Sequence, residues 1–531
     1  MAAVSEAPPV SAITAALQAR QAARLAPWPD RAVEGLLADA VYTERRRLAR
    51  PRTDADRAEA AAIEAAARAV HGGRAAVEAA IQGLVARYTA EIHSPFSPRT
   101  HALASKVMPG ALARLLTAAH PAELLAREFD PQARIQVRGA VDRVRKLAAS
   151  HTLVLAPTHV SNLDSPILGT ALFSAGLPPF LYGAGLNLFD NRLVGFFMGR
   201  LGAYTVDRQK KHALYKDVLK DYATEAIGRG SHMLFFPGGT RSRSGEVERR
   251  PKRGLLGTAV AAWQEGLERR RPQPEVLVVP VTLSFALVLE AETLIADALA
   301  EAGKSRFIIT DDEFSQPRTV ASFVSRVLAL DASVVVHIGE PLDVLGNPVD
   351  DEGRTLDPAG RVVDRRGYVC GPDGAVVGDA QRDAAYTTLL SDALARAWAR
   401  DNTLQPTHLV ACAAWSLYRS TTPQLDTWQR MFTAPERRQL GRAPLLRQVG
   451  RVLAQATADA QAGRYRLALP AGASAEGLLD IALDRFGRFH TRAAIGPGPG
   501  PGLWVDPQLC LYYANRCVGT GLDALPTGEG T

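Results

Sequence analysis

Cysteines, aromatic residues and long apolar runs are all scarce in this chain. Its 531 residues include four cysteines, none in a Cys-x-x-Cys pair, so disulfides are not expected to hold the fold together. A reducing, cytoplasmic setting fits this composition. Aromatic residues make up 6% of the chain, and no nucleic-acid-binding motif accompanies its scattered arginines. We therefore expect no nucleic-acid partner.

The apolar runs are too short to predict a membrane-spanning helix. The most apolar of them, residues 276–289, falls below the roughly 18–20 residues that such a helix needs and contains Pro280, so we interpret it as buried strand. The start of the chain lacks the basic and apolar regions of a secretory signal peptide, and none is expected. Any membrane contact is expected to be peripheral.

The sequence lacks the patterns that are typical of two kinds of enzyme site. His, Asp and Glu are not grouped at metal-ligand spacing and no Gly-x-Ser-x-Gly turn occurs, which argues against a metal enzyme and a serine hydrolase. The chain otherwise has a globular composition, with 47% hydrophobic residues and a net charge of +7 from 62 Lys and Arg against 55 Asp and Glu. Because single cores stop growing at about 250–300 residues, we expect roughly two or three domains.

The predicted fold is α/β, with a central mixed sheet flanked by helices and with helical regions at both ends of the chain. Residues 1–130 are rich in Ala and Arg at helical spacing, whereas short β-branched runs alternate with helical stretches over 131–345. Turn signals fill residues 346–380, which we interpret as an excursion of hairpins and loops. Helical patterning returns over 381–531.

A histidine and an aspartate follow the strand predicted at residues 152–156. His159 comes just after the strand, and Asp164 or Ser165 is expected to cap the next helix. A tight turn brings the carboxylate against the imidazole, which fixes the ring tautomer and leaves one nitrogen free to accept a proton from an alcohol. The alternative is a capping aspartate beside an ordinary turn histidine. The same spacing at His212 and Asp217 lies in a helical stretch, where residues five apart do not share a face.

A second polar turn follows the strand predicted near residues 232–236. Its Gly-Gly-Thr amides and the side chains of Arg241 and Arg243 have the chemistry of a phosphate cradle. An exposed basic hairpin is the alternative. Arg208 ends a third short β-type run, and by itself it is no different from a solvated surface arginine.

Taken in order, four segments resemble the glycerolipid acyltransferase superfamily, specifically the bacterial glycerol-3-phosphate O-acyltransferases. They are His159-Val-Ser-Asn-Leu-Asp164, Gly202-Ala-Tyr-Thr-Val-Asp-Arg208, Phe236-Pro-Gly-Gly-Thr-Arg-Ser-Arg243 and Val279-Pro-Val-Thr-Leu-Ser-Phe285. With family-like segments at 339–343 and 407–411, the resemblance covers about residues 150–415.

This resemblance implies direct transfer of a fatty acyl group to the sn-1 hydroxyl of glycerol 3-phosphate, with acyl-carrier protein or coenzyme A as donor and no bound cofactor. His159 is then the general base and Asp164 its orienting partner. Arg208 and Arg241 would hold the acceptor phosphate in a groove shared with His159, and the cradle would be completed by Gly239, Thr240, Ser242 and Arg243. Backbone amides near the helix after Asp164 are expected to help stabilise the oxyanion.

The chain departs from the family pattern at two places. Gly238 stands where the third segment usually carries Glu, and Phe285-Ala-Leu287 stands where the fourth usually continues Tyr-Asp-Arg, although Glu290 matches a later acidic position. The acceptor is therefore open between glycerol 3-phosphate, dihydroxyacetone phosphate and a lysophospholipid, and a non-catalytic lipid- or carrier-binding relative is a further alternative. Basic runs at 134–146, 249–253 and 269–271 either face an anionic membrane or carrier protein, or are solvated.

Overall fold

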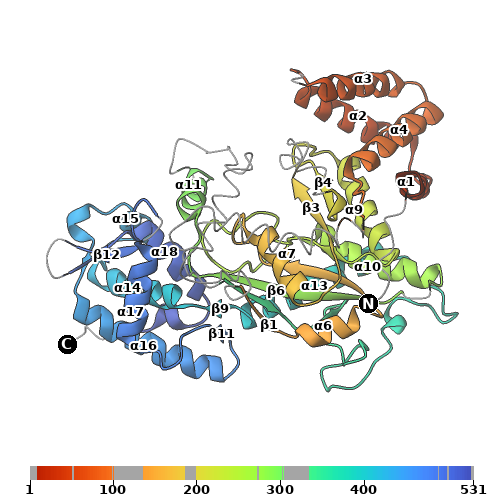
Figure 1. Cartoon of the computed structure of the whole chain (residues 1–531). Helices are drawn as coiled ribbons and strands as arrows, with labels where there is room; N and C mark the ends of the chain where they lie inside the picture. Colours follow the sequence, from red (N-terminus) through yellow and green to blue (C-terminus); the bar gives the residue numbers. More distant parts are fainter. Residues whose placement is uncertain are drawn as a thin grey trace.

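The computed structural model of the chain describes residues 9–50, 53–97, 100, 135–185, 199–271, 274–301, 303, 334–487, 490–498 and 502–527. The predicted domain boundary at residue 130 and Arg134 of the first basic run lie outside these ranges. Figure 1 shows the N-terminal helices at one end, the sheet in the middle and the C-terminal helices at the other end.

In the described part of the N-terminal region the helices are α1 (Val10–Leu25), α2 (Asp30–Arg47), α3 (Asp54–Ala69) and α4 (Arg74–Ile92). Their starts have local causes, because Pro29 precedes α2 and a capping box between Thr53 and Asp56 begins α3. The helices pack on one another and on α9 (Ala213–Gly228) through buried aliphatic side chains.

Among the described residues, the central sheet has eight strands: β1 (Ile135–Gly139), β2 (Thr152–Pro157), β3 (Leu181–Gly185), β4 (Ala203–Val206), β5 (Met233–Leu234), β6 (Val276–Phe285), β7 (Val334–Ile338) and β8 (Leu342–Asp343). Their order is β1-β7-β6-β2-β5-β3-β4, with β8 also paired to β6. β6 runs antiparallel to β7 and β8, and the other pairs are parallel. The predicted mixed sheet is confirmed. Residues 276–289 were interpreted as buried strand, and they are buried, but β6 ends at Phe285 and residues 286–289 are not strand.

Helices cover both faces of this sheet. Alternate residues of β2 enter different hydrophobic clusters, Leu153 and Leu155 in one and Val154 and Ala156 in the other, as the two-residue period of a strand requires. The first cluster contains residues of α6 (Val141–Leu147), α7 (Asp164–Ser174) and α11 (Ala291–Glu301). The second contains residues of α9, α10 (Arg253–Glu268) and α13 (Ala380–Arg400). Because β2 to β6 run in one direction, the turns that follow them meet at one edge of the sheet.

The excursion at residues 346–380 consists of turns joined by isolated antiparallel bridges. Three turns, Asp343–Gly346, Asp350–Gly353 and Asp357–Gly360, recur every seven residues. In each, the aspartate accepts backbone N–H groups two and four residues later, and the glycine has positive φ. The sequence analysis predicted turns here but not their regular spacing.

The C-terminal region contains α14 (Pro406–Thr421), α15 (Thr427–Met431), α16 (Arg442–Gln461), α17 (Ala475–Phe486) and α18 (Pro507–Ala514). It also holds two small sheets, β10 (Gln439–Leu440) with β12 (Ile495–Pro497) and β13 (Leu503–Val505), and β9 (Thr403–Leu404) with β11 (Arg466–Leu467). The sequence analysis predicted helical patterning here and no strands. In the described ranges, no helix combines the length and the hydropathy that crossing a membrane requires.

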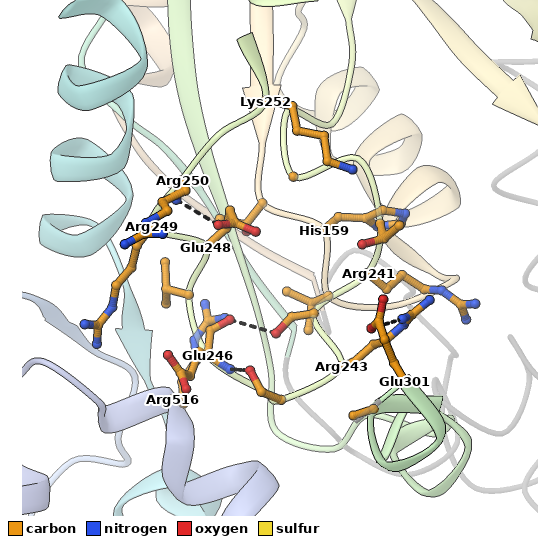
Figure 2. A pocket seen from close by; sticks show the side chains of 18 residues that line it. His159, Arg241, Arg243, Glu246, Glu248, Arg249, Arg250, Lys252, Glu301 and Arg516 are labelled. Atoms are coloured by element: carbon orange, nitrogen blue, oxygen red, sulfur yellow. Dashed lines mark hydrogen bonds and ion pairs between the residues drawn. The ribbon is translucent and has the colours of Figure 1, made fainter. Parts of the chain in front are cut away.

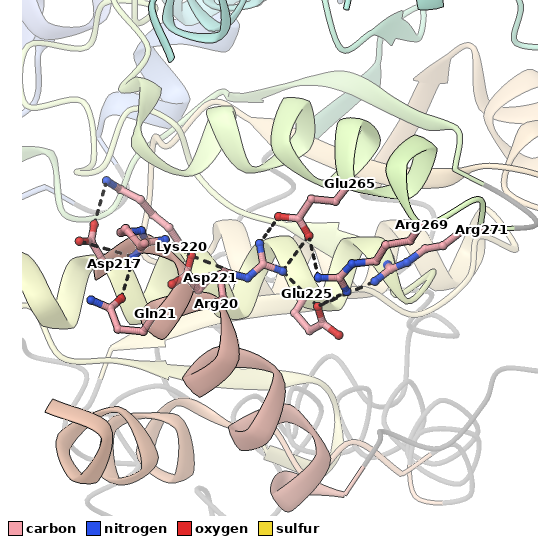
Figure 3. Close-up of polar contacts among 10 residues, drawn as sticks. Arg20, Gln21, Asp217, Lys220, Asp221, Glu225, Glu265, Arg269 and Arg271 are labelled. Carbon is pink, nitrogen blue, oxygen red and sulfur yellow. Dashed lines mark hydrogen bonds and ion pairs between the residues drawn. The ribbon is translucent and has the colours of Figure 1, made fainter. Parts of the chain in front are cut away.

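Ion pairs attach α1 to the central domain (Figure 3). Arg20 of α1 bonds Glu225 of α9 and Glu265 of α10. Arg269 and Arg271 also lie 3.6 and 3.9 Å from Glu225. Two members of the basic run at 269–271 therefore have carboxylate partners within the fold, which weakens the prediction that this run faces a membrane.

Candidate active site

His159 and Asp164 form a hydrogen-bonded pair in the turn between β2 and α7. His159 Nδ1 lies 2.7 Å from Asp164 Oδ2, and the amides of Val160 and Ser161 donate to the same oxygen at 2.6 and 3.0 Å. Because that carboxylate oxygen accepts the Nδ1 proton, Nε2 is left as the basic nitrogen. The imidazole also stacks on Phe236, with ring centroids 4.2 Å apart.

Asp164 does not cap the helix, contrary to the prediction. Leu163 is the N-cap of α7 without a side-chain bond, Asp164 is the first helical residue and Ser165 is exposed. The Asp164 carboxylate instead turns back onto the preceding loop, where it is 0% exposed. Its second oxygen, Oδ1, has no hydrogen-bond partner among the described residues.

The second histidine and aspartate five residues apart, His212 and Asp217, do not form a hydrogen-bonded pair. His212 is the N-cap of α9 and accepts the amide of Tyr215, while Asp217 pairs with Arg24 and Lys220. Burial lowers the pKa of His212 to about 4. His212 is therefore a neutral, structural histidine.

Glu290 connects the His159 turn to the second motif. Its carboxylate accepts bonds from the Ser161 hydroxyl and the Asn162 amide, and it lies 3.7 Å from Arg241 Nη1. Burial raises the pKa of Glu290. Together with Asp164, it fixes the turn and orients Arg241 beside it.

The amides from Val160 to Asp164 all donate within this turn, to Asp164, Glu290 or Ser161. None of these five N–H groups is therefore available to an oxyanion. The expected contribution concerned amides of the helix after Asp164, which these bonds do not test, and it stays a prediction.

The Gly-Gly-Thr turn after β5 packs directly against the His159 turn. The Ser242 amide donates to the His159 carbonyl at 2.8 Å, and Gly239 takes φ of +76°, which favours glycine. Gly239 also lies against Lys252, because a Cβ there would come within 2.6 Å of the ammonium nitrogen. These contacts place the cradle beside the imidazole.

The two turns share a cavity of about 820 Å³ (Figure 2). Of the predicted site residues, His159, Thr240, Arg241, Ser242 and Arg243 line it. Asp164 lies behind His159, and Gly239 supports the wall without lining it. Arg243 is ion-paired with Glu301 of α11, which also lines the cavity.

Arg208 is not among the lining residues. It follows β4 at the same edge of the sheet, but β3 separates β4 from β5, and its side chain is exposed. Lys210, two residues on, is buried between Glu59 and Glu91 of the N-terminal helices. The predicted meeting of His159, Arg208 and Arg241 is thus found for His159 and Arg241, and the phosphate-binding role of Arg208 stays a prediction.

Several lining residues escaped the sequence analysis as site residues. The cavity also presents Glu246, Glu248, Arg249, Arg250, Lys252, Glu301 and Arg516. Six cations and three carboxylates line it in all, a balance that favours an anionic ligand. The 249–253 run was recognisable as basic, but no local pattern marked Arg516.

Glu248 lies close to Gly238, the position at which the family pattern usually has Glu. Its carboxylate oxygen Oε2 lies 3.8 Å from the position that a Cβ on Gly238 would take. A carboxylate is therefore present beside the cradle although the third segment lacks its usual Glu.

The comparisons with known proteins fall on this part of the chain. Residues 134–284 match the family model described as Acyltransferase. This stretch is an acyltransferase domain. Glycerol-3-phosphate acyltransferases from Haemophilus ducreyi and Histophilus somni are 36% and 37% identical to this chain over 174 residues, and that from Xanthomonas axonopodis pv. citri is 29% identical over 203. The predicted resemblance to glycerolipid acyltransferases is confirmed for the acyltransferase domain.

The matched region is a small part of those relatives. It covers 32% of this chain and 20% of the Haemophilus and Histophilus proteins, and 38% of this chain and 21% of the Xanthomonas protein. A crystal structure of a 1-acyl-sn-glycerophosphate acyltransferase from Thermotoga maritima aligns over 47% of this chain and 90% of that one, at 14% identity. Its TM-score of 0.25 is too low to bear on the fold or the function.

Proposed function

We propose that this chain transfers a fatty acyl group from an acyl thioester to the sn-1 hydroxyl of glycerol 3-phosphate, giving lysophosphatidic acid. The observation that carries the proposal is the His159–Asp164 pair, held at 2.7 Å in the wall of a cavity lined mainly by cations, within an acyltransferase domain. A base and an anion site in one cavity are what acylation of a phosphorylated alcohol needs.

In this reaction His159 Nε2 accepts the hydroxyl proton as the acceptor oxygen attacks the thioester carbonyl. The tetrahedral oxyanion then collapses and expels the thiolate, which takes the proton back from the imidazolium. Asp164 stabilises the imidazolium through Nδ1 and keeps the ring in its tautomer. The thioester is already activated, so no covalent enzyme intermediate is required.

The cationic wall of the cavity gives the acceptor phosphate its binding site in this proposal. Arg241 is the central ligand, because Glu290 holds it beside the His159 turn, and Thr240 and Ser242 flank it. Arg243 is tied to Glu301, so we assign it a supporting role. Dihydroxyacetone phosphate and a lysophospholipid, which present the same phosphate chemistry, are the alternative acceptors.

We propose acyl-carrier protein or acyl-coenzyme A as the donor and no bound cofactor. Both donors are acidic, and the exposed Arg249 and Arg250 at the cavity give them a complementary surface. The product partitions into lipid, so we also propose that the protein works at the inner face of the cell membrane.

The test incubates the purified full chain with acyl-coenzyme A or acyl-carrier protein and a mixture of the three acceptors, and identifies products by mass spectrometry. The proposal expects lysophosphatidic acid from the wild type and none from His159→Ala. If only one of the other two acceptors is acylated, that acceptor and not glycerol 3-phosphate is the substrate. Donor binding without any product would instead favour a non-catalytic relative.

A further inference from the structure

Lys252 lies over the Gly-Gly-Thr turn of the cradle. A Cβ on Gly239 would come within 2.6 Å of its Nζ and 2.8 Å of its Cδ, so the whole end of the side chain follows the turn. The Lys252 amide donates to the Pro237 carbonyl at 2.7 Å, which fixes the backbone in this place. Lys252 lines the cavity, and Figure 2 shows it on the same side as His159 and Arg241. Its ammonium is therefore presented where the acceptor phosphate is proposed to bind.

The local structure around Lys252 is unfavourable for a cation. Lys252 is the N-cap of α10 and makes no capping bond, the first turn of the helix has no acidic residue, and Arg253 is its first member. N-caps are usually Ser, Thr, Asp or Asn, and a positive charge at this end of a helix opposes the helix dipole. The lysine therefore reduces the stability of α10. Departures from local rules of this kind are typical of functional positions.

The two arginines of the cradle already have carboxylates near them. Arg241 lies 3.7 Å from Glu290, and Arg243 is ion-paired with Glu301. Lys252 has no carboxylate within 4.0 Å in the part of the chain that the structure describes. Of the three cations at the cradle, it is thus the one whose charge is left for a ligand.

Two carboxylates of the same cavity, Glu246 and Glu248, oppose anion binding. The Glu248 side chain accepts the Arg250 amide at 2.8 Å and approaches the cradle at Gly238. Neither carboxylate lies within 4.0 Å of Lys252. Both lower the positive potential of the cavity, so an anion at the cradle depends on a cation that they do not neutralise.

We propose that Lys252 is a ligand of the acceptor phosphate and selects phosphomonoesters. Its ammonium supplies the charge, whereas Arg241 supplies oriented N–H donors beside His159. A phosphomonoester carries about −1.5 to −2 charges at pH 7, more than a guanidinium already facing a carboxylate can balance. The inference rests on the proposed function and adds the residue that recognises the acceptor's charge.

The kinetic test compares Lys252→Met with Lys252→Arg in the full chain. We expect Lys252→Met to raise KM for glycerol 3-phosphate about 30-fold and to leave kcat within about threefold, because the phosphate is bound equally in the ground and transition states. Lys252→Arg should restore most of the affinity. An unchanged KM in Lys252→Met, or a loss confined to kcat, would overturn the proposal.

The matched control is Arg253→Met. It removes the same charge from the same end of α10, but Arg253 is bonded to Thr388 at 2.6 Å and does not line the cavity. KM should stay within about twofold of the wild type. An equal rise of KM in both variants would overturn the inference, because the general positive field and not a phosphate contact would then be responsible.

A second readout needs no turnover. Isothermal titration calorimetry with inorganic phosphate and with glycerol 3-phosphate measures binding to the wild type and both variants. We expect Kd to rise about tenfold or more in Lys252→Met and to stay unchanged in Arg253→Met. The melting temperature of Lys252→Met should be equal to or above that of the wild type, because a cation is removed from the positive end of α10.

A lower melting temperature with unchanged phosphate binding would show that Lys252 is structural and would overturn the inference. Phosphate binding that is absent from the wild type would overturn it as well. A wild type that binds phosphate through Lys252 but transfers no acyl group would instead refute the proposed function and support Lys252 as the phosphate ligand.

Discussion

Replacing Asp164 by asparagine removes one charge from the site while conserving its shape. Oδ2 of Asp164 accepts three hydrogen bonds, from His159 and from the amides of Val160 and Ser161. The side-chain oxygen of the introduced asparagine must take the Oδ2 position, because an NH₂ group there could not accept these three hydrogen bonds. That NH₂ group then occupies the Oδ1 position, which is buried and has no acceptor among the described residues.

The expected loss follows from the bond to His159. A hydrogen bond to a charged group contributes about 1.5–3 kcal/mol, and each 1.36 kcal/mol of activation free energy changes a rate tenfold. If the charge acts mainly on the imidazolium in the transition state, kcat should fall about 10- to 150-fold. KM for the acceptor should change little, since Asp164 lies behind His159 and does not line the cavity.

The assay is steady-state acyl transfer by purified Asp164→Asn, with circular dichroism to show that the variant is folded. The matched control is Asp217→Asn at the second copy of the spacing, where the aspartate pairs with Arg24 and Lys220 rather than with a histidine. The control should keep its kcat. An unaltered kcat in a folded Asp164→Asn would refute the assignment of the pair as acid–base machinery.

Two further predictions concern acceptor binding and stability. Glu248→Gln should lower KM for the acceptor severalfold with little change in kcat, because it removes a negative charge from the cavity proposed to bind the acceptor phosphate, and steady-state kinetics on glycerol 3-phosphate check this. Burial lowers the pKa of His408 to about 3, so the unfolded chain takes up a proton there below about pH 6.5 that the folded chain refuses. As the pH falls from 6.5 to 4, the free energy of unfolding of the wild type should therefore decrease faster than that of His408→Gln, by up to about 1.4 kcal/mol for each pH unit. Urea unfolding at several pH values measures both free energies. Equal pH dependence of the two proteins would contradict the prediction.

The His159–Asp164 pair was predictable because its cause is local. A buried strand, a four-residue turn and the start of a helix bring two side chains five positions apart together, whichever fold surrounds them. The same spacing at His212 shows why that context matters, because there the histidine caps a helix and the aspartate points elsewhere. The mixed sheet was predictable for a similar reason, since β-branched runs alternate with helical stretches.

The rest of the site depends on long-range packing that periodicity does not encode. In the order β5-β3-β4, the strand β3 separates Arg208 from the cradle, whereas the family resemblance implied a shared groove. Arg516 looks like any other arginine in the sequence, and only the docking of α18 on the cradle loop brings it to Leu283. The short strands of the C-terminal region, two or three residues each, carry too little pattern to be distinguished from loops.

The acyltransferase domain as the family model delimits it does not contain a complete sheet. β7 lies outside residues 134–284, yet it is the strand that joins β1 to β6, so without it β1 has no partner and one edge of β6 is exposed. Glu290, which lies 3.7 Å from Arg241, and Arg516, which lines the same cavity, also lie beyond residue 284. The matched stretch therefore contains His159, Asp164 and Arg241, while the chain that follows supplies residues that contact them or line their cavity. Substitutions in the C-terminal region that disturb α18 are accordingly expected to affect the chemistry of His159 and not only the stability of the fold.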